Sequence, residues 1–174
     1  MRITAFVAAL ACAGAIVTAQ SPVTKESVPG IVNFAKVETT VACAGATTPA
    51  ALVEVKRMGY ASVINLRQAS EPGADIEASA AAAKAAGLNY IHIPFNAASP
   101  DAMVVDNFIK AVTDKANQPA FIHCASANRA AALWMVKRLV VDKWDVERAS
   151  TEAAALGLTN PTLKAFAIEQ AQKR

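Results

Sequence analysis

After residue 30 the hydrophobic pattern of the chain switches repeatedly between a strand-like and a helix-like period. Short apolar or β-branched runs indicate strands, which we expect at 34–37, 40–43, 62–66, 90–93 and 120–122. Between these runs, apolar residues recur every three or four positions, as they do on the buried face of a helix. The pattern therefore predicts strands and helices in alternation.

Two of the predicted helices begin with a hydroxyl residue followed by proline. Thr48-Pro49 and Ser99-Pro100 each supply a side chain that can cap the first amides and a proline that suits the first helical position. The first of these helices is expected to end at Gly59, because glycine readily takes the left-handed conformation that closes many helices. An alanine-rich helix lies between the two in the sequence.

Three further helices are expected after the last strand, at 130–141, 146–156 and 161–170. The first of them is apolar nearly all round, which indicates a helix inside the domain. Strands joined by crossover helices form right-handed parallel units. We therefore expect an α/β domain of three layers, in which helices flank a mostly parallel sheet.

The first residues have the pattern of a targeting segment. Arg2 precedes an apolar stretch, and small residues lead to a cleavage point after Ala19, which is the arrangement of a secretory signal peptide. We expect residues 1–19 to be a signal peptide, 20–30 an extended leader and 31–174 a single domain. The mature protein would then be secreted or periplasmic.

Charge and composition exclude several classes of function. The chain has 17 Lys+Arg and 14 Asp+Glu, a net charge of +3 without a basic run. We therefore expect no nucleic-acid binding and, after signal cleavage, no membrane binding. Cys43, Cys124, His92 and His123 follow no zinc-binding spacing, so we expect no metal and no cofactor. No feature of the sequence indicates an oligomeric state.

The loop after the last predicted strand carries the chemistry, and it reads His123-Cys124-Ala125-Ser126-Ala127-Asn128-Arg129. Ligands of open parallel sheets bind beyond the carboxyl ends of the strands, and a small-residue loop at a helix start presents its amides to an anion. The positive electrostatic potential of these amides also stabilises a thiolate. An arginine can give an oxyanion two parallel hydrogen bonds. We predict that Cys124 is a nucleophile and Arg129 an anion clamp; the alternative is a buried structural cysteine.

His123-Cys124 followed by Arg129 resembles the signature of protein tyrosine and dual-specificity phosphatases. More closely, the chain is similar to the bacterial phosphatase-like family related to the N-terminal part of β-lactamase-hydrolase-like proteins. This likeness spans roughly residues 35 to 160 and rests on the segments 44–45, 48–49, 63–67, 86–88, 92–94 and 134–158. The resemblance implies the fold of the protein tyrosine and dual-specificity phosphatases.

The resemblance also implies a mechanism. Cys124 would attack phosphorus to give a phosphocysteine, which water would then hydrolyse. The amides from Ala125 to Arg129, with the Arg129 guanidinium, would hold the phosphoryl oxygens, and His123 would orient the loop and help to keep the pKa of Cys124 low. The substrate would be a phosphate monoester, on a small molecule or a protein, with phosphotyrosine as one candidate.

The loop departs from the tyrosine phosphatase pattern in three ways. Four residues separate Cys124 from Arg129 instead of five, which is the spacing of rhodanese-type sulfurtransferases. Ala127 replaces the usual glycine, although Asn128 could take a left-handed conformation, and Ala130 stands where phosphatases commonly have Ser or Thr. Two alternatives therefore stay open: a sulfurtransferase that carries a persulfide on Cys124, and an anion-binding module with weak catalysis.

Three residues outside the loop are further candidates. Asp101 follows the strand at 90–93, so we predict that it is the general acid; the alternative is that it complements the dipole of the next helix. Arg67, at the carboxyl end of its strand, either contacts an anionic substrate or pairs with a carboxylate. Cys43 either forms a disulfide with Cys124 or is a buried thiol.

Overall fold

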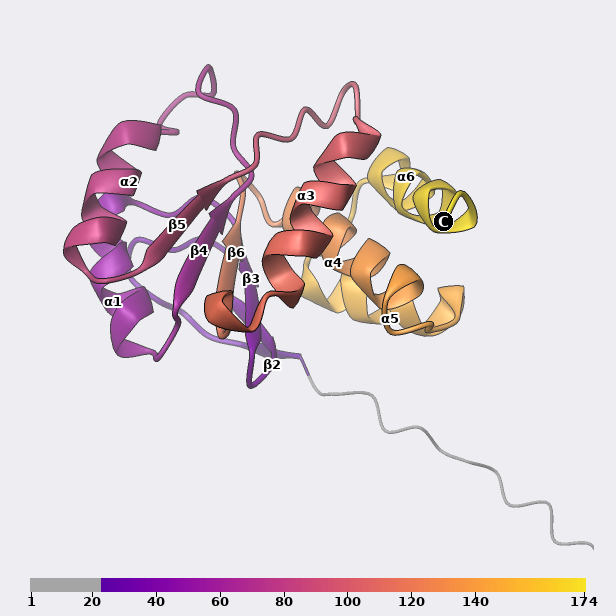
Figure 1. The fold of residues 1–174 in the computed structure, drawn as a ribbon, viewed down its shortest axis with the longest axis horizontal. Coiled ribbons are helices and arrows are strands. Elements are labelled where there is room, and N and C mark those ends of the chain that lie inside the picture. Colours follow the sequence, from indigo (N-terminus) through magenta and orange to yellow (C-terminus); the bar gives the residue numbers. More distant parts are fainter. Residues whose placement is uncertain (1–22) are drawn as a thin grey trace, which may run out of the picture.

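The computed structural model describes residues 23–174 (Figure 1). The predicted signal peptide, residues 1–19, lies outside the described residues and stays a prediction, as does the location that it implies. Part of the predicted leader is described, and it takes part in the sheet, since Thr24 pairs with Lys36 and Lys25 with Ala35.

A six-stranded sheet lies at the centre of the protein, with the strand order β1-β2-β3-β6-β4-β5. The neighbours from β3 to β5 in this order are parallel, whereas β1 and β2 are antiparallel additions at one edge. The strands are Thr24–Lys25 (β1), Ala35–Glu38 (β2), Val41–Ala44 (β3), Ser62–Asn65 (β4), Asn89–His92 (β5) and Ala120–His123 (β6).

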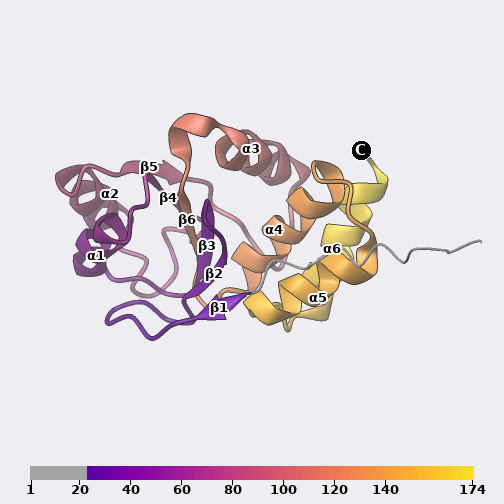
Figure 2. The ribbon, with the colours of Figure 1, turned by 90° about the horizontal axis from the view of Figure 1, so that it is seen from below.

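Helices cover both faces of this sheet, α1 and α2 on one side and α3 to α6 on the other (Figure 1, Figure 2). The helices are Leu52–Arg57 (α1), Ile76–Ala85 (α2), Ala102–Thr113 (α3), Asn128–Val140 (α4), Val146–Leu156 (α5) and Pro161–Gln172 (α6), with 3-10 turns at Pro49–Ala51 (η1) and Lys115–Asn117 (η2). The prediction of a three-layer, mostly parallel α/β domain is confirmed.

Each face of the sheet has its own apolar core. Under α1 and α2, the Phe34 and Phe121 rings stack with their centroids 6.1 Å apart. On the other face, Ile64 and Ile122 pack in the same cluster as Trp134 of α4. Burying such a large apolar side chain contributes about 1.5–3 kcal/mol. The nearly all-round apolar pattern of α4 is explained by its place between the sheet and the outer helices α5 and α6.

The two predicted hydroxyl caps are wrong in detail. Thr48 makes no side-chain cap hydrogen bond, and a 3-10 turn precedes α1. At the start of α3 the cap is Asp101, whose carboxylate accepts from the amide of Met103 at 2.9 Å, and not Ser99. A carboxylate is as good a cap as a hydroxyl, so the helix begins two residues later than the proline pattern suggested.

A buried ionic cluster joins the edge of the sheet to the outer helices. Arg138 of α4 contacts Glu152 of α5 at 2.7 Å, Glu38 of β2 at 2.7 Å and Asp142 at 2.8 Å. Its guanidinium also lies over the Trp144 ring, 4.1 Å from the centroid. Burial disfavours the charged form of Arg138, but the hydrogen bonds to Glu152 and Asp142 outweigh this effect and raise its pKa.

Within residues 23–174, no helix combines the length and the apolar character that a membrane crossing requires.

Candidate active site

The predicted loop lies between β6 and α4, at the edge of the sheet where the parallel strands have their carboxyl ends. Its backbone is fastened to the end of β3, because the Cys124 amide donates to the Ala44 carbonyl at 3.2 Å and the Ala125 carbonyl accepts from the Ala46 amide at 2.9 Å. The first amides of α4, from Asn128 onward, have no intrahelical partner because they form the first helical turn. The loop therefore lies at a helix start beyond the carboxyl ends of the strands, as predicted, and its binding of an anion stays a prediction.

Cys124 is fully buried, with 0% of its surface exposed, and shares an apolar cluster with Cys43. Cys43 on β3 is paired in register with Ile122 on β6. Cys124 follows Ile122 by two residues, so the two thiols point to the same face of the sheet. Neither forms a disulfide. Burial, and then the neighbouring Cys124, raise the pKa of the Cys43 thiol well above its ordinary value. Cys43 is thus a buried, protonated thiol in this structure.

Ala127 takes the left-handed conformation in the loop, with φ at 76°. The sequence suggested Asn128 for this conformation, but Asn128 is already the first residue of α4. A left-handed non-glycine residue costs about 1–2 kcal/mol. The Ala127 side chain lies against the turn after α5, where a Cβ placed at Gly157 would be 3.4 Å from that of Ala127.

The side chain of Asn128 fixes the loop to the turn between α5 and α6. Its Oδ1 accepts hydrogen bonds from the amides of Thr159 and Asn160, both at 2.8 Å, while its Nδ2 lies 3.4 Å from the Ser126 hydroxyl. Among the contacts of the described residues, Ser126 makes no hydrogen bond to Cys124. Its hydroxyl contacts Asn128 within the loop instead. The hydrogen bonds from Thr159 and Asn160 hold the Asn128 side chain against the turn between α5 and α6.

Arg129 is held by Glu71, which lies in the turn between β4 and α2. Both carboxylate oxygens accept from the guanidinium, at 2.5 Å from Nη1 and 2.7 Å from Nη2. Nη1 also donates to the carbonyls of Leu66 and Phe95, at 3.2 and 2.8 Å, next to the ends of β4 and β5. These contacts use Nη1 and Nη2, which leaves the Nε side of the guanidinium for another partner.

The pKa values of this pair follow from that geometry. Burial alone would raise the pKa of Glu71, but the hydrogen bonds from Arg129 and from the Gln68 amide bring it down to about 2. Burial likewise opposes the charge on Arg129, yet Glu71 and the nearby Cys124 raise its pKa. At neutral pH Glu71 is therefore an anion that positions Arg129, and it is not a proton donor.

Arg67 shares the same carboxylate. Its Nε lies 3.3 Å from Glu71 Oε2, and its terminal nitrogens donate to the carbonyls of Pro72 and Gly73, both at 2.6 Å. Of the two roles predicted for Arg67, the ion pair is the one observed. Arg67 and Arg129 are 6% and 7% exposed, so one carboxylate serves two buried guanidinium groups.

His123 is buried and neutral. Burial, and then the positive charge of Arg67, lower its pKa to about 3. Neither ring nitrogen has a hydrogen-bond partner among the described residues, and the ring stacks on Phe121 at 5.7 Å. A neutral imidazole adds no positive charge near Cys124, so any help from His123 would come through orientation of the loop.

Asp101 is not placed beside the loop. It is exposed, caps α3 and lines a cavity of about 500 Å³ between β5 and α3, together with His92 and Lys110. No residue from 124 to 129 lines that cavity. The observed contact matches the alternative reading of Asp101 as a helix cap, and its role as general acid stays a prediction. His92 is a hydrogen-bonded strand residue, with Nε2 2.7 Å from the Arg67 carbonyl.

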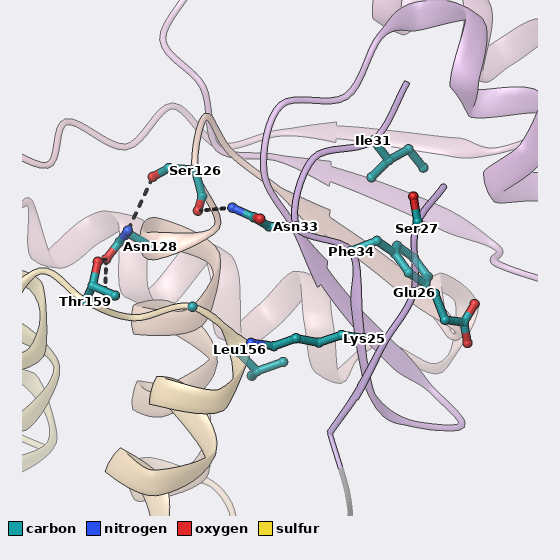
Figure 3. A pocket seen from close by; sticks show the side chains of 11 residues that line it. Lys25, Glu26, Ser27, Ile31, Asn33, Phe34, Ser126, Asn128, Leu156 and Thr159 are labelled. Atoms are coloured by element: carbon teal, nitrogen blue, oxygen red, sulfur yellow. Dashed lines mark hydrogen bonds between the residues drawn. The ribbon is translucent and has the colours of Figure 1, made fainter. Parts of the chain in front are cut away.

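A second cavity, of about 690 Å³, lies directly against the loop (Figure 3). Ser126 and Asn128 line it on the loop side. The opposite walls come from the N-terminal segment 25–34 and from the turn after α5, and the lining residues there are Lys25, Glu26, Ser27, Ile31, Asn33, Phe34, Leu156, Gly157 and Thr159. In the part of the chain that the structure describes, no group of three or more His, Cys, Asp or Glu residues could hold a metal ion.

The chain matches the model of a known protein family. The model of the β-lactamase hydrolase-like protein, phosphatase-like domain, matches residues 33–141, which is more than half of the chain. The chain belongs to this family. The resemblance drawn from the Cys124 loop and the segments around it is therefore confirmed. No curated protein matches the sequence.

Solved structures share the fold of this chain. A putative phosphatase from Shewanella putrefaciens has a TM-score of 0.70 and 21% identity, over 83% of this chain and 92% of its own. TpbA from P. aeruginosa, as a cysteine-to-serine variant in complex with pTyr, has a TM-score of 0.67 and 16% identity, over 89% and 98%. The core catalytic domain of the S. cerevisiae PP-IP phosphatase has a TM-score of 0.65 and 16% identity, over 82% and 87%. At these identities the likeness establishes the fold.

Proposed function

We propose that the protein is a cysteine-dependent phosphatase of phosphate monoesters, in which Cys124 is the nucleophile and Arg129 binds the phosphoryl group. Phosphotyrosine, on a small molecule or on a protein, is one candidate substrate. A secreted or periplasmic location is part of the proposal, on the strength of the signal-like residues 1–19.

The observation that carries the proposal is the charge around the loop. Two buried guanidinium groups, Arg67 and Arg129, share the single carboxylate of Glu71. Buried charges are normally compensated, so this arrangement favours one further anion. That anion would lie between the Nε side of Arg129 and the first amides of α4, next to Cys124, where a phosphoryl group or a thiolate is stabilised.

The reaction follows from these positions. The Cys124 thiolate forms a sulfur–phosphorus bond while the bond from phosphorus to the leaving oxygen breaks, and the leaving oxygen takes a proton from a general acid. Water then attacks phosphorus, the sulfur–phosphorus bond breaks, and phosphate leaves. Asp101 is the candidate acid, and this role requires the segment between β5 and α3 to move toward the loop.

Cys124 is completely covered in this structure, so the reaction also requires the covering residues to move. Glu71 would act as a positioning residue, because its contacts fix the plane of the Arg129 guanidinium. Donors that are already in place stabilise developing charge without reorganisation, and the loss of one such donor costs about 100-fold to 1000-fold in rate.

The test uses the protein from residue 20 onward and its Cys124→Ser variant. We expect phosphate release from an aryl phosphate by the first protein and none by the variant. Release that survives the substitution would remove Cys124 from the mechanism. As a matched control, Cys43→Ser changes the other buried thiol and should retain turnover.

The four-residue spacing between Cys124 and Arg129 favours one rival, sulfur transfer through a persulfide on Cys124. Incubation with thiosulfate and cyanide distinguishes the two reactions, because only a sulfurtransferase forms thiocyanate. Thiocyanate without phosphate release would replace the phosphatase proposal. Inactivity in both assays, with phosphate binding retained, would leave an anion-binding module.

A further inference from the structure

The cavity beside the loop is built largely by segments that the family match does not include. Lys25, Glu26 and Ser27 precede the matched residues 33–141, and Leu156 to Thr159 follow them. On the loop side, the cavity is lined by Ser126 and Asn128 (Figure 3). Cys124 and Arg129 are not among the lining residues, so a ligand held by the loop amides would enter this space past Ser126 and Asn128.

These walls are fastened to the loop. The Asn33 side chain donates to the Ser126 carbonyl at 3.4 Å, and the turn at Thr159 donates to Asn128 Oδ1 at 2.8 Å. On the other side, the Glu26 amide donates to the Phe34 carbonyl at 3.2 Å, which holds the N-terminal segment beside β2. The cavity thus has a defined shape relative to Cys124.

The charge of the cavity is asymmetric. Glu26 is neutralised by Lys36, with the two charged groups 2.9 Å apart. The side chain of Lys25 has no hydrogen bond or ion pair with any residue that the structure describes, and it reaches across the cavity toward the end of α5 (Figure 3). One uncompensated ammonium therefore faces a space that Phe34, Ile31 and Leu156 also line.

We propose that this cavity binds the leaving group of the phosphate ester and that Lys25 selects leaving groups with a second anionic group, a carboxylate or a phosphate. The inference rests on the proposed function. The apolar side chains would contact the body of the leaving group, and Lys25 would pair with its charge. An exposed or half-exposed pair of this kind changes affinity by up to roughly fivefold.

The experiment measures binding in the Cys124→Ser background, so that no ligand is consumed. Calorimetry compares three short peptides in which phosphotyrosine is flanked by Asp, by phosphoserine or by Asn. We expect the Asp and phosphoserine peptides to bind about threefold to fivefold more tightly than the Asn peptide at low salt, and the difference to shrink as salt is added. The Asp and phosphoserine arms show which anion is preferred.

Three further substitutions make the test specific. Lys25→Gln should bring the affinity ratio of acidic to neutral peptide close to one, whereas Lys84→Gln, the same charge change on α2, should leave the ratio unchanged. Glu26→Gln should raise the ratio, because it removes the acid from the cavity wall and releases Lys36. Equal binding of all three peptides, or a ratio that does not respond to Lys25→Gln, would overturn the inference.

The two proposals can fail separately. If the protein with Cys124 hydrolyses all three peptides but shows no Lys25-dependent preference, the phosphatase proposal stands and the role of the cavity is wrong. If it hydrolyses none, while the Cys124→Ser variant keeps the Lys25-dependent preference, the cavity binds anionic ligands and the catalytic proposal is wrong.

Discussion

The pair formed by Glu71 and Arg129 allows a quantitative prediction for Glu71→Gln. Glutamine keeps the size of the side chain and one acceptor oxygen but removes the charge. The pKa of Glu71 falls from 4.5 to about 2 on folding, and each pKa unit is worth about 1.4 kcal/mol. This gives roughly 3 kcal/mol as an upper figure, and because the side chain is 20% exposed we expect a loss of about 2 kcal/mol at neutral pH.

The stability contribution of Glu71 depends on pH. A carboxylate whose pKa is lowered by folding stabilises the protein above the unfolded-state pKa, and this contribution is lost as the pH falls through the folded-state value. The stability difference between the parent protein and Glu71→Gln should therefore be full above about pH 5 and should shrink toward about pH 2. Urea unfolding at a series of pH values measures it.

A matched control is Glu54→Gln, because Glu54 forms an exposed ion pair with Arg57 on α1. We expect this change to alter the free energy of unfolding by less than about 0.5 kcal/mol at any pH in the series. A stability difference for Glu71→Gln that stays constant from neutral to acidic pH would refute the assignment, since the loss would then come from packing and not from the charge.

Three other changes test separate features. Ala127→Gly should stabilise the protein by about 0.5 kcal/mol in urea unfolding, because it removes left-handed strain but adds freedom to the unfolded chain; destabilisation would mean that the contact with Gly157 matters more. Arg138→Met should lower the free energy of unfolding by about 3–5 kcal/mol, because the buried Glu152 loses its positive partner and keeps only the hydrogen bond from the Trp134 indole; thermal unfolding within a degree of the parent would contradict this. Asp101→Asn keeps the α3 cap, so the free energy of unfolding should change by less than about 0.5 kcal/mol. A loss of about 100-fold in the rate of phosphate release, with loss of the basic limb of its pH profile, would support the general-acid role. An unchanged rate and pH profile would exclude that role.

The sequence sufficed for the features that depend on neighbouring residues. The strand at 120–122, the small residues after it and the apolar helix that follows are local signals, and they place Cys124 directly after β6 and Arg129 at the start of α4. The same holds for the three C-terminal helices. Local periodicity reports directly on such elements because each one buries a continuous face.

Contacts between distant segments were not predictable in the same way. Glu71 lies 58 positions from Arg129, and its Pro-Gly neighbours indicate only a turn. The one signal for Glu71 is its position, because a buried arginine needs a carboxylate and Glu71 follows a strand that ends at the same edge of the sheet. β1 was missed for a related reason: a two-residue strand is defined by its partner β2 and not by its own pattern.

The left-handed residue of the loop shows how competing preferences are resolved. Asparagine tolerates this conformation better than alanine does, which pointed to Asn128. In the structure the Asn128 side chain is needed for its hydrogen bonds to residues 159 and 160, and α4 begins there. The strain therefore falls on Ala127, one residue earlier.

The place of β6 in the sheet has a consequence for the order of folding. β6 lies between β3 and β4, yet among the described strands it is synthesised last, so until residue 123 is available β3 and β4 have no partner on their facing edges. Unpaired strand edges invite wrong pairings, and pairing over long sequence separations is slow. The insertion of β6 completes the sheet and brings Cys124 against β3 in one step. A nascent or truncated chain that lacks β6 would therefore have neither a continuous sheet nor the loop that follows β6.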